Sequence, residues 1–150
     1  LNGDADMIAT DHAPHALEDK DKPYWEAPSG IPGTQLMLPL LLDAAHRGLC
    51  AHEQVLQWVC SRPAATYKIE ARGAIRESYH ADLVVIDPEM KRTVEDRDEQ
   101  TKVGWSPWRG RTLTGWPVMT FVGGTLAATV GPDGIRLHSE PGCATEVDFG

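Results

Sequence analysis

A short apolar segment, residues 5–10, leads directly into Asp11-His12-Ala13-Pro14-His15, and this junction constrains the fold more than any other stretch of the chain. The apolar segment contains β-branched residues and is too brief for a helix, so it predicts a buried strand. Asp11 would then stand at the C-terminal end of that strand. In folds with parallel strands, ligands and catalytic groups gather at those ends. Asp11 is therefore a candidate metal ligand or general base.

The two histidines that follow Asp11 strengthen this interpretation. Pro14 fixes its own φ and would hold His15 in a set direction from Asp11. The alternative is a loop cap, in which the Asp11 carboxylate accepts backbone N–H groups and takes no part in chemistry. Spacing alone leaves both interpretations open.

Several motifs, in their order along the chain, help to decide between a catalytic Asp11 and a loop cap. They are the segment at 11–15, the Pro/Gly-rich run at 27–33, Arg62-Pro63-Ala64, Ala81-Asp82-Leu83, Gly104-Trp105-Ser106-Pro107 and Gly115-Trp116-Pro117. Together they resemble the C-terminal third of dihydroorotases in the amidohydrolase superfamily, over roughly residues 4–128. The combination of Asp-His-Ala-Pro-His with Gly-Trp-Ser-Pro is the specific part. The chain departs from the pattern at Gln35, where relatives usually have Glu, and at Ser78 and His80.

This resemblance implies an α/β fold class: the C-terminal part of a metal-dependent amidohydrolase TIM barrel, followed by part of a small β-sandwich domain. Residues 1–72 would be the last βα unit and the terminal helices of the barrel. Residues 73–130 would be the C-terminal half of the sandwich, and residues 131–150 a poorly ordered tail. Because a whole barrel needs about 250 residues, we interpret the 150-residue chain as a fragment.

The resemblance also implies a reaction and roles for four residues. Dihydroorotases interconvert L-dihydroorotate and N-carbamoyl-L-aspartate in pyrimidine biosynthesis, using one or two zinc ions. Asp11 matches the residue that binds zinc and carries a proton from the attacking hydroxide to the departing ring nitrogen. His15 matches the position that binds the substrate carboxylate, and the backbone at Ser29 and Gly30 matches the part that contacts the pyrimidine ring. The family's other zinc ligands are absent from this sequence, so the chain alone should be inactive.

Two other functions stay open. Hydantoinases and allantoinases share the fold and much of the loop pattern. A metal-free, non-catalytic domain that scaffolds a transcarbamoylase partner is the second alternative, although such domains usually lose their metal ligands, whereas Asp11 and His15 are intact. An N-terminal His-x-His would favour the enzyme. A homodimer is a further possible assembly.

Charge and cysteine usage exclude other classes of protein. The formal net charge of −8 leaves no basic stripe for nucleic acid or for an anionic membrane surface. The 3 cysteines are widely spaced and form no Cys-x-x-Cys pair, which indicates neither a disulfide framework nor a thiolate zinc site. We expect a cytoplasmic enzyme acting on a small molecule, without a transmembrane segment.

Periodicity predicts helices in the first half of the chain. Residues 18–33 form a loop. A helix follows, with Thr34 as a plausible N-cap and a stop at Gly48; Pro39 implies either a later start or a kinked first turn. A second helix covers residues 52–61 and ends before Pro63.

Strand patterns dominate the second half. We expect a buried strand at 83–86, closed by Asp87-Pro88, and a shorter strand at 91–94. Residues 118–122 and 125–129 flank Gly123-Gly124, which predicts a β-hairpin with a type I′ turn. Residues 131–134 form a turn. The tryptophans of Trp105-Ser106-Pro107-Trp108 could serve a lid or an interface, and a buried structural role is the commoner one.

Overall fold

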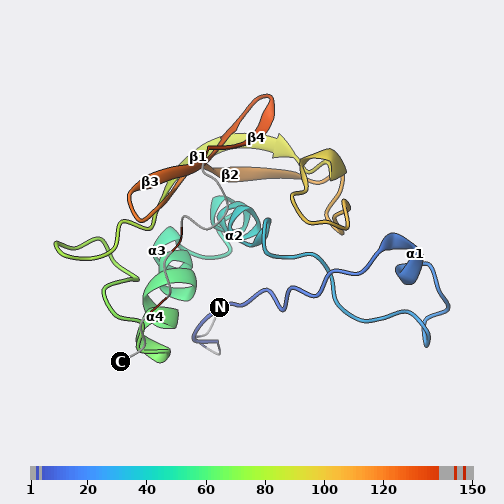
Figure 1. Ribbon diagram of the computed structural model, residues 1–150, viewed down its shortest axis with the longest axis horizontal. Coiled ribbons are helices and arrows are strands. Elements are labelled where there is room, and N and C mark those ends of the chain that lie inside the picture. The colour runs from blue at the N-terminus through green and yellow to red at the C-terminus, as the bar shows by residue number, and fades with distance from the viewer. Residues whose placement is uncertain (1–2, 4, 139–143, 145–146, 148–150) are drawn as a thin grey trace.

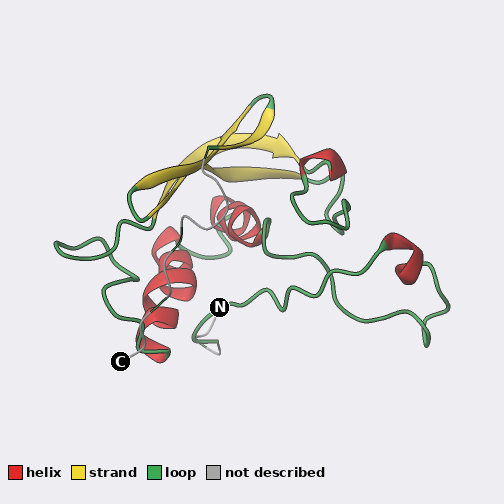
Figure 2. Ribbon diagram, in the orientation of Figure 1, coloured by secondary structure: helices red, strands yellow, loops and turns green. Residues whose placement is uncertain are grey.

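The computed structural model describes residue 3, residues 5–138, and residues 144 and 147. It is a mixed α/β structure in which helices lie beneath an antiparallel sheet and a long loop projects to one side (Figures 1 and 2). The helices are α1 (Leu17–Lys20), α2 (Met37–His46), α3 (His52–Leu56) and α4 (Arg62–Thr66). The strands are β1 (Leu83–Thr93), β2 (Thr112–Val122), β3 (Thr125–Gly131) and β4 (Gly134–Leu137), and they pair in the order β1-β2-β3-β4. None of the described helices is long and apolar enough to cross a membrane.

The N-terminal segment corrects one expectation, because residues 5–10 form no strand. This segment contacts the rest of the chain through the Ile8 N–H, which donates to the Trp58 carbonyl at 3.3 Å, and through the Asp6 carbonyl, which accepts from Arg62 at 3.2 Å. An isolated parallel bridge joins His12 to Ile31 just beyond it. A strand needs a neighbouring strand along its length to satisfy its backbone groups. The four described strands lie together in a separate sheet, so the segment is extended without a ladder (Figure 2).

Helix α2 starts later than Thr34, at Met37, with Leu36 as its N-cap residue. This resolves the question raised by Pro39, which lies in the first turn, where backbone N–H groups have no partner within the helix. The helix ends at His46, and Gly48 follows with φ +73°, which confirms the predicted stop.

The core lies between α2 and the sheet. One cluster of buried residues in it consists of Leu36, Val94, Leu113 and Trp116. The Asp43 carboxylate of α2 is also buried and accepts the Thr114 backbone N–H of β2 at 3.1 Å. This bond fastens the helix to the second strand, so the part of the chain that leads into α2 is anchored to the sheet.

The second helical region runs beyond its predicted end. Instead of stopping before Pro63, α3 passes through a π-helical turn, Gln57–Ser61, and continues as α4 to Thr66. In a regular α-helix the Pro63 ring would clash with the carbonyl four residues earlier. The wider π turn lies directly before Pro63 and gives that ring room. The expectation that Pro63 ends the helix is therefore wrong.

Strand β1 is a single strand of 11 residues rather than two shorter ones. Its register shifts between Asp87 and Lys91, which accommodates Pro88 without ending the strand. Because β1 is an edge strand of the described sheet, the missing N–H of a proline is tolerated there. Val84 and Val85 are 45% and 44% exposed, so the expectation of a buried strand is also wrong.

The hairpin expectation is confirmed. β2 and β3 pair around Gly123 and Gly124, whose φ angles of +54° and +81° have the signs that a type I′ turn requires. The Asp82 carboxylate accepts the Gly123 N–H at 2.7 Å and binds Arg72 at 2.8 Å, and these two bonds lower the pKa of that carboxyl. The turn is thereby tied to the segment before β1.

The expected tail needs a correction at its start. Residues 131–134 form the predicted turn, but the chain then returns as β4, which pairs with β3. Backbone pairing with β3 orders this stretch even though it contains few large apolar residues. Apart from 144 and 147, residues 139–150 lie outside the described part, so the expectation about them is not tested.

Candidate functional site

The predicted site residues all lie on one loop, which begins at Asp11 and is closed at its base. The Ala13 N–H donates to the Ile31 carbonyl at 3.2 Å. The His12 Nδ1 accepts the backbone N–H groups of Gly33 at 3.1 Å and Thr34 at 3.3 Å. These contacts join the two ends of the loop, and α1 lies in its projecting part (Figure 1).

His12 thus has a role that sequence reasoning did not assign. An imidazole nitrogen that accepts hydrogen bonds carries no proton, so the neutral ring places its proton on Nε2. The side chain acts as the cap for the loop, the task that the alternative interpretation had given to Asp11. Its position directly after Asp11 was the only signal in the sequence, and the partner amides 21 and 22 residues away could not be inferred from it.

Asp11 itself is exposed and stands apart from these bonds. Within the described residues, its carboxylate accepts no hydrogen bond and forms no ion pair. Its φ of +46° is in the left-handed region, which Asp adopts more readily than most residues and which is often found at functional sites. The loop-cap interpretation of Asp11 has no support in this geometry, and its carboxylate oxygens are open to a ligand.

Gly30 brings the far side of the loop against the Asp-His-Ala segment. Its φ is +96°, and a Cβ added there would lie 2.7 Å from both the Cβ and the carbonyl oxygen of Ala13. Only a glycine permits this approach. Ser29, the exposed residue before it, is consequently held near the backbone two residues after Asp11. The structure therefore places the Ser29-Gly30 backbone close to Ala13, two residues after Asp11.

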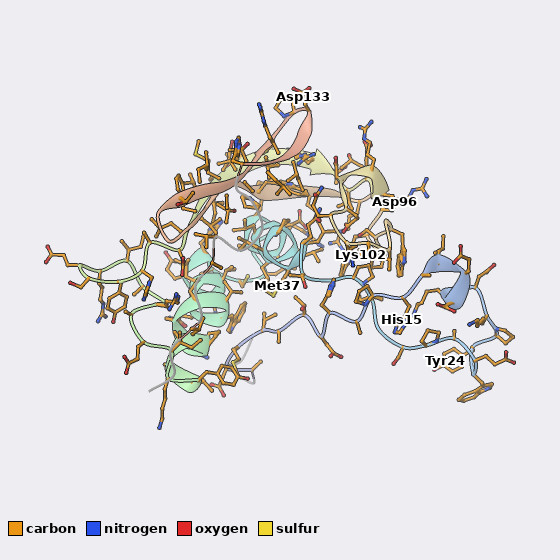
Figure 3. All side chains as sticks on the ribbon, in the orientation of Figure 1. His15, Tyr24, Met37, Asp96, Lys102 and Asp133 are labelled. Atoms are coloured by element: carbon orange, nitrogen blue, oxygen red, sulfur yellow. The ribbon has the colours of Figure 1, made fainter. Side chains whose placement is uncertain are left out.

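His15 lies nearer the base of the projecting loop than Tyr24 does (Figure 3). Its side chain is half-buried, and its carbonyl accepts the indole N–H of Trp105 at 2.9 Å. Trp105 is half-buried and Trp108 packs against the core, which supports the structural role expected for these tryptophans. The indole N–H links the loop to a segment 90 residues away.

The departure at Gln35 also has a structural explanation. Its Nε2 donates to the Asp98 carbonyl at 2.8 Å, and its Oε1 accepts the Gln100 N–H at 2.8 Å. A carboxylate could accept but could not donate. Gln35 therefore fastens the end of the loop to the segment after β1, and it does not weaken the assignment of the site.

We expect Trp105→Phe to loosen this loop, because Phe keeps a six-membered aromatic ring but loses the pyrrole ring and the N–H that binds the His15 carbonyl. One lost hydrogen bond lowers the free energy of unfolding by about 1 kcal/mol. Urea titration of the complete protein measures it. Trp25→Phe is the matched control, because Trp25 is 92% exposed. Equal effects of the two substitutions would show that the Trp105 bond contributes nothing.

No metal centre is assembled within the described ranges. No group of three or more His, Cys, Asp or Glu side chains among residues 3, 5–138, 144 and 147 is arranged to hold an ion. A catalytic zinc takes three protein ligands, and Asp11 is a single candidate. These residues by themselves do not fit a zinc site.

The sequence of the chain is similar to those of known amidohydrolases. A sequence profile described as "Amidohydrolase family" matches residues 1–127. The chain is 41% identical over 124 residues to a dihydroorotase of Halobacterium salinarum, covering 83% of this chain and 29% of the relative. It is 40% identical over 128 residues to one of Bacillus cereus, covering 85% and 30%. The chain thus spans about 30% of the length of these curated relatives.

Solved structures resemble the chain as well. The L-hydantoinase (dihydropyrimidinase) of Arthrobacter aurescens matches with a TM-score of 0.88 and 30% identity, covering 97% of this chain and 33% of that one. A D-hydantoinase (dihydropyrimidinase) of a Thermus species matches with a TM-score of 0.76 and 25% identity, covering 81% and 28%. The helices and the antiparallel sheet described above therefore correspond to part of a known fold.

Proposed function

The chain belongs to the amidohydrolase family, and from this premise we propose that it forms part of a dihydroorotase, which reversibly hydrolyses L-dihydroorotate to N-carbamoyl-L-aspartate in pyrimidine biosynthesis. The observation that carries the proposal is the loop at 11–34, in which Gly30 packs against Ala13, two residues after Asp11, and the Asp11 carboxylate has no partner among the described residues. The identity of about 40% to dihydroorotases supports it.

We propose an architecture to accompany this activity. Residues 1–72 would be the last βα unit and terminal helices of a TIM barrel, and residues 73–130 the C-terminal half of a small β-sandwich. The likeness to the Arthrobacter L-hydantoinase structure along 97% of the chain supports an architecture shared with that protein. A homodimer or a complex with a transcarbamoylase is a proposal of the same kind.

Asp11 is proposed to move the proton that the reaction requires. When a water oxygen attacks the amide carbon, the C–N bond breaks, the water loses a proton and the ring nitrogen gains one. A carboxylate close to both atoms can accept the first proton and deliver the second. The exposure of Asp11 and its lack of a described protein partner leave it open to this task.

His15 and the Ser29-Gly30 backbone would bind the substrate. An imidazole N–H can donate a charge-assisted hydrogen bond to the substrate carboxylate, away from the bond that breaks. The backbone of Ser29 and Gly30 would contact the planar amide groups of the ring. All three lie on the loop whose two ends are joined at residues 12–13 and 31–34, which supports a common ligand.

Zinc is part of the proposal for the complete protein only. Dihydroorotases use one or two ions, and a bound zinc supplies a water whose pKa is lowered to about 7. Asp11 is the ligand that this chain would contribute. Because the described residues do not complete a site, the other ligands would have to come from elsewhere.

The test is a comparison of three substrates with the complete purified protein. We expect dihydroorotate to be hydrolysed with a kcat/KM about 100-fold or more above that of hydantoin and allantoin, because only dihydroorotate offers its ring carboxylate to His15. A preference for hydantoin would instead favour a hydantoinase, the second candidate, which the likeness to the Arthrobacter L-hydantoinase supports. Hydrolysis of none of the three would favour the non-catalytic scaffold.

His15→Ala should raise the KM for dihydroorotate by about 10-fold or more and change kcat little, because a charge-assisted hydrogen bond away from the scissile bond is lost. Steady-state kinetics of the complete protein measure this, with the exposed His46 changed to Ala as control. Inhibition by dihydrouracil, which lacks the carboxylate, should be unaffected. Equal weakening of both ligands would remove His15 from the carboxylate site.

A further inference from the structure

Lys20 occupies an unusual position in the loop. It is the last residue of α1, and its side chain is half-buried. The Nζ donates to the Pro28 carbonyl at 2.6 Å and to the Gly30 carbonyl at 3.0 Å. These two carbonyls are those on either side of Ser29. One ammonium group therefore holds both ends of the short backbone segment that is proposed to contact substrate.

The surroundings separate Lys20 from an ordinary surface lysine. Within the described residues it has no carboxylate partner at ion-pair distance, whereas the neighbouring Lys22 pairs with Asp19 at 2.6 Å in an exposed position. A charged amine that is half-buried needs polar partners to offset lost hydration. The two carbonyls are the polar partners of Lys20, so its ammonium group binds the backbone around Ser29.

Peptide geometry then determines where the neighbouring amide points. The peptide unit between Pro28 and Ser29 is planar and trans, so its C=O and N–H point in opposite directions. Because the Pro28 carbonyl points at Lys20, the Ser29 N–H points away from it. The described residues provide no acceptor for that N–H or for the Gly30 N–H. Both donors remain available to a ligand.

We propose that Lys20 is a positioning residue: by holding the Pro28 and Gly30 carbonyls, it presents the Ser29 N–H as a hydrogen-bond donor to a carbonyl oxygen of the substrate ring. The inference rests on the proposed function, and it adds a residue and an atom to the substrate site. Gly30, packed against Ala13, supplies the second support of the same segment.

The test compares Lys20→Met with Lys22→Met in the complete protein. Met has nearly the same length as Lys and cannot donate, so only Lys20→Met releases the two carbonyls. We expect Lys20→Met to raise the KM for dihydroorotate by about 10-fold and to keep kcat within about 2-fold of wild type. This pattern is expected when the lost hydrogen bond stabilises the bound substrate and the transition state equally. Lys22→Met should leave both constants unchanged.

A second readout needs no substrate. Hydrogen–deuterium exchange at the Gly33 and Thr34 amides, which bond to His12 at the end of the loop, should be about 10-fold faster in Lys20→Met than in Lys22→Met, because the segment opens more often. Lys20→Arg should restore slow exchange and a KM within about 3-fold of wild type, since the guanidinium fork can donate to two carbonyls. This rescue separates positioning from a general loss of folding.

The outcomes separate a failure of the proposed role of Lys20 from a failure of the proposed dihydroorotase function. If the wild-type protein hydrolyses dihydroorotate but the two methionine variants exchange equally, Lys20 does not hold the segment and the inference is overturned. Faster exchange in Lys20→Met with an unchanged KM overturns the presentation of Ser29 to substrate. If wild type hydrolyses none of the cyclic amides, the proposed function fails, and the exchange comparison still decides whether Lys20 holds the loop.

Discussion

Replacement of Asp11 by Asn in the complete protein will lower the turnover of dihydroorotate by about 100- to 10,000-fold in both directions, the range typical of a positioned acid–base group. Asn has almost the size of Asp and also tolerates the left-handed φ of +46° found here. The thermal midpoint should therefore stay close to that of wild type, so that the loss is one of chemistry.

The control for this experiment is Asp21→Asn, which changes an exposed carboxylate on the same loop and should leave kcat unchanged. Initial rates measured in both directions provide the comparison. Retention of more than about a tenth of wild-type turnover by Asp11→Asn would show that another group moves the proton.

Gly30→Ala is expected to have the second largest effect. Its Cβ would overlap the Ala13 carbonyl oxygen and Cβ, both 2.7 Å away, and neither is the end of a flexible side chain. The loop must then move away from the Asp11 segment. A displacement of about 1 Å in a reacting geometry costs about 100-fold, so we expect kcat/KM to fall by about that factor or more.

Gly48→Ala is the matched control for Gly30→Ala. Gly48 also has a left-handed φ, +73°, but no atom lies within 4 Å of its added Cβ. Both substitutions carry backbone strain of about 1–3 kcal/mol, and only Gly30→Ala adds the overlap at the site. In Gly30→Ala both the thermal midpoint and kcat/KM should therefore fall. In Gly48→Ala only the thermal midpoint should fall. If the kcat/KM values of Gly30→Ala and Gly48→Ala differed by less than about threefold, the close contact of Gly30 with Ala13 would be contradicted.

Local chemistry explains the expectations that were confirmed. The stop of α2 at Gly48 and the hairpin at Gly123-Gly124 depend on positive φ angles that glycine adopts without strain. These features depend on neighbours in the sequence, so they can be inferred from it. The wrong expectations at residues 5–10, Pro63 and Pro88 share a different cause. Each depends on what the rest of the chain places beside the segment.

Pro63 and Pro88 illustrate that dependence. A proline ends a regular helix or central strand, but a π turn precedes Pro63 and an edge-strand irregularity surrounds Pro88. Neither device has a signature in the sequence around it. The chain at 5–10 has the composition of a strand and lacks a described strand to pair with, because backbone hydrogen bonds in a sheet always come from a second segment.

For the candidate site, the sequence by itself determined which residues are proposed to bear the chemistry, since Asp11, His15 and the Ser29-Gly30 turn were predicted from type, order and family resemblance. Only the tertiary structure decided how they are held. His12 caps Gly33 and Thr34, Lys20 binds the carbonyls around Ser29, and Trp105 reaches the His15 carbonyl. The physical reason is that the partners of all three are backbone groups. Every residue carries such groups, so residue type cannot reveal which of them a distant side chain will meet until the chain has folded.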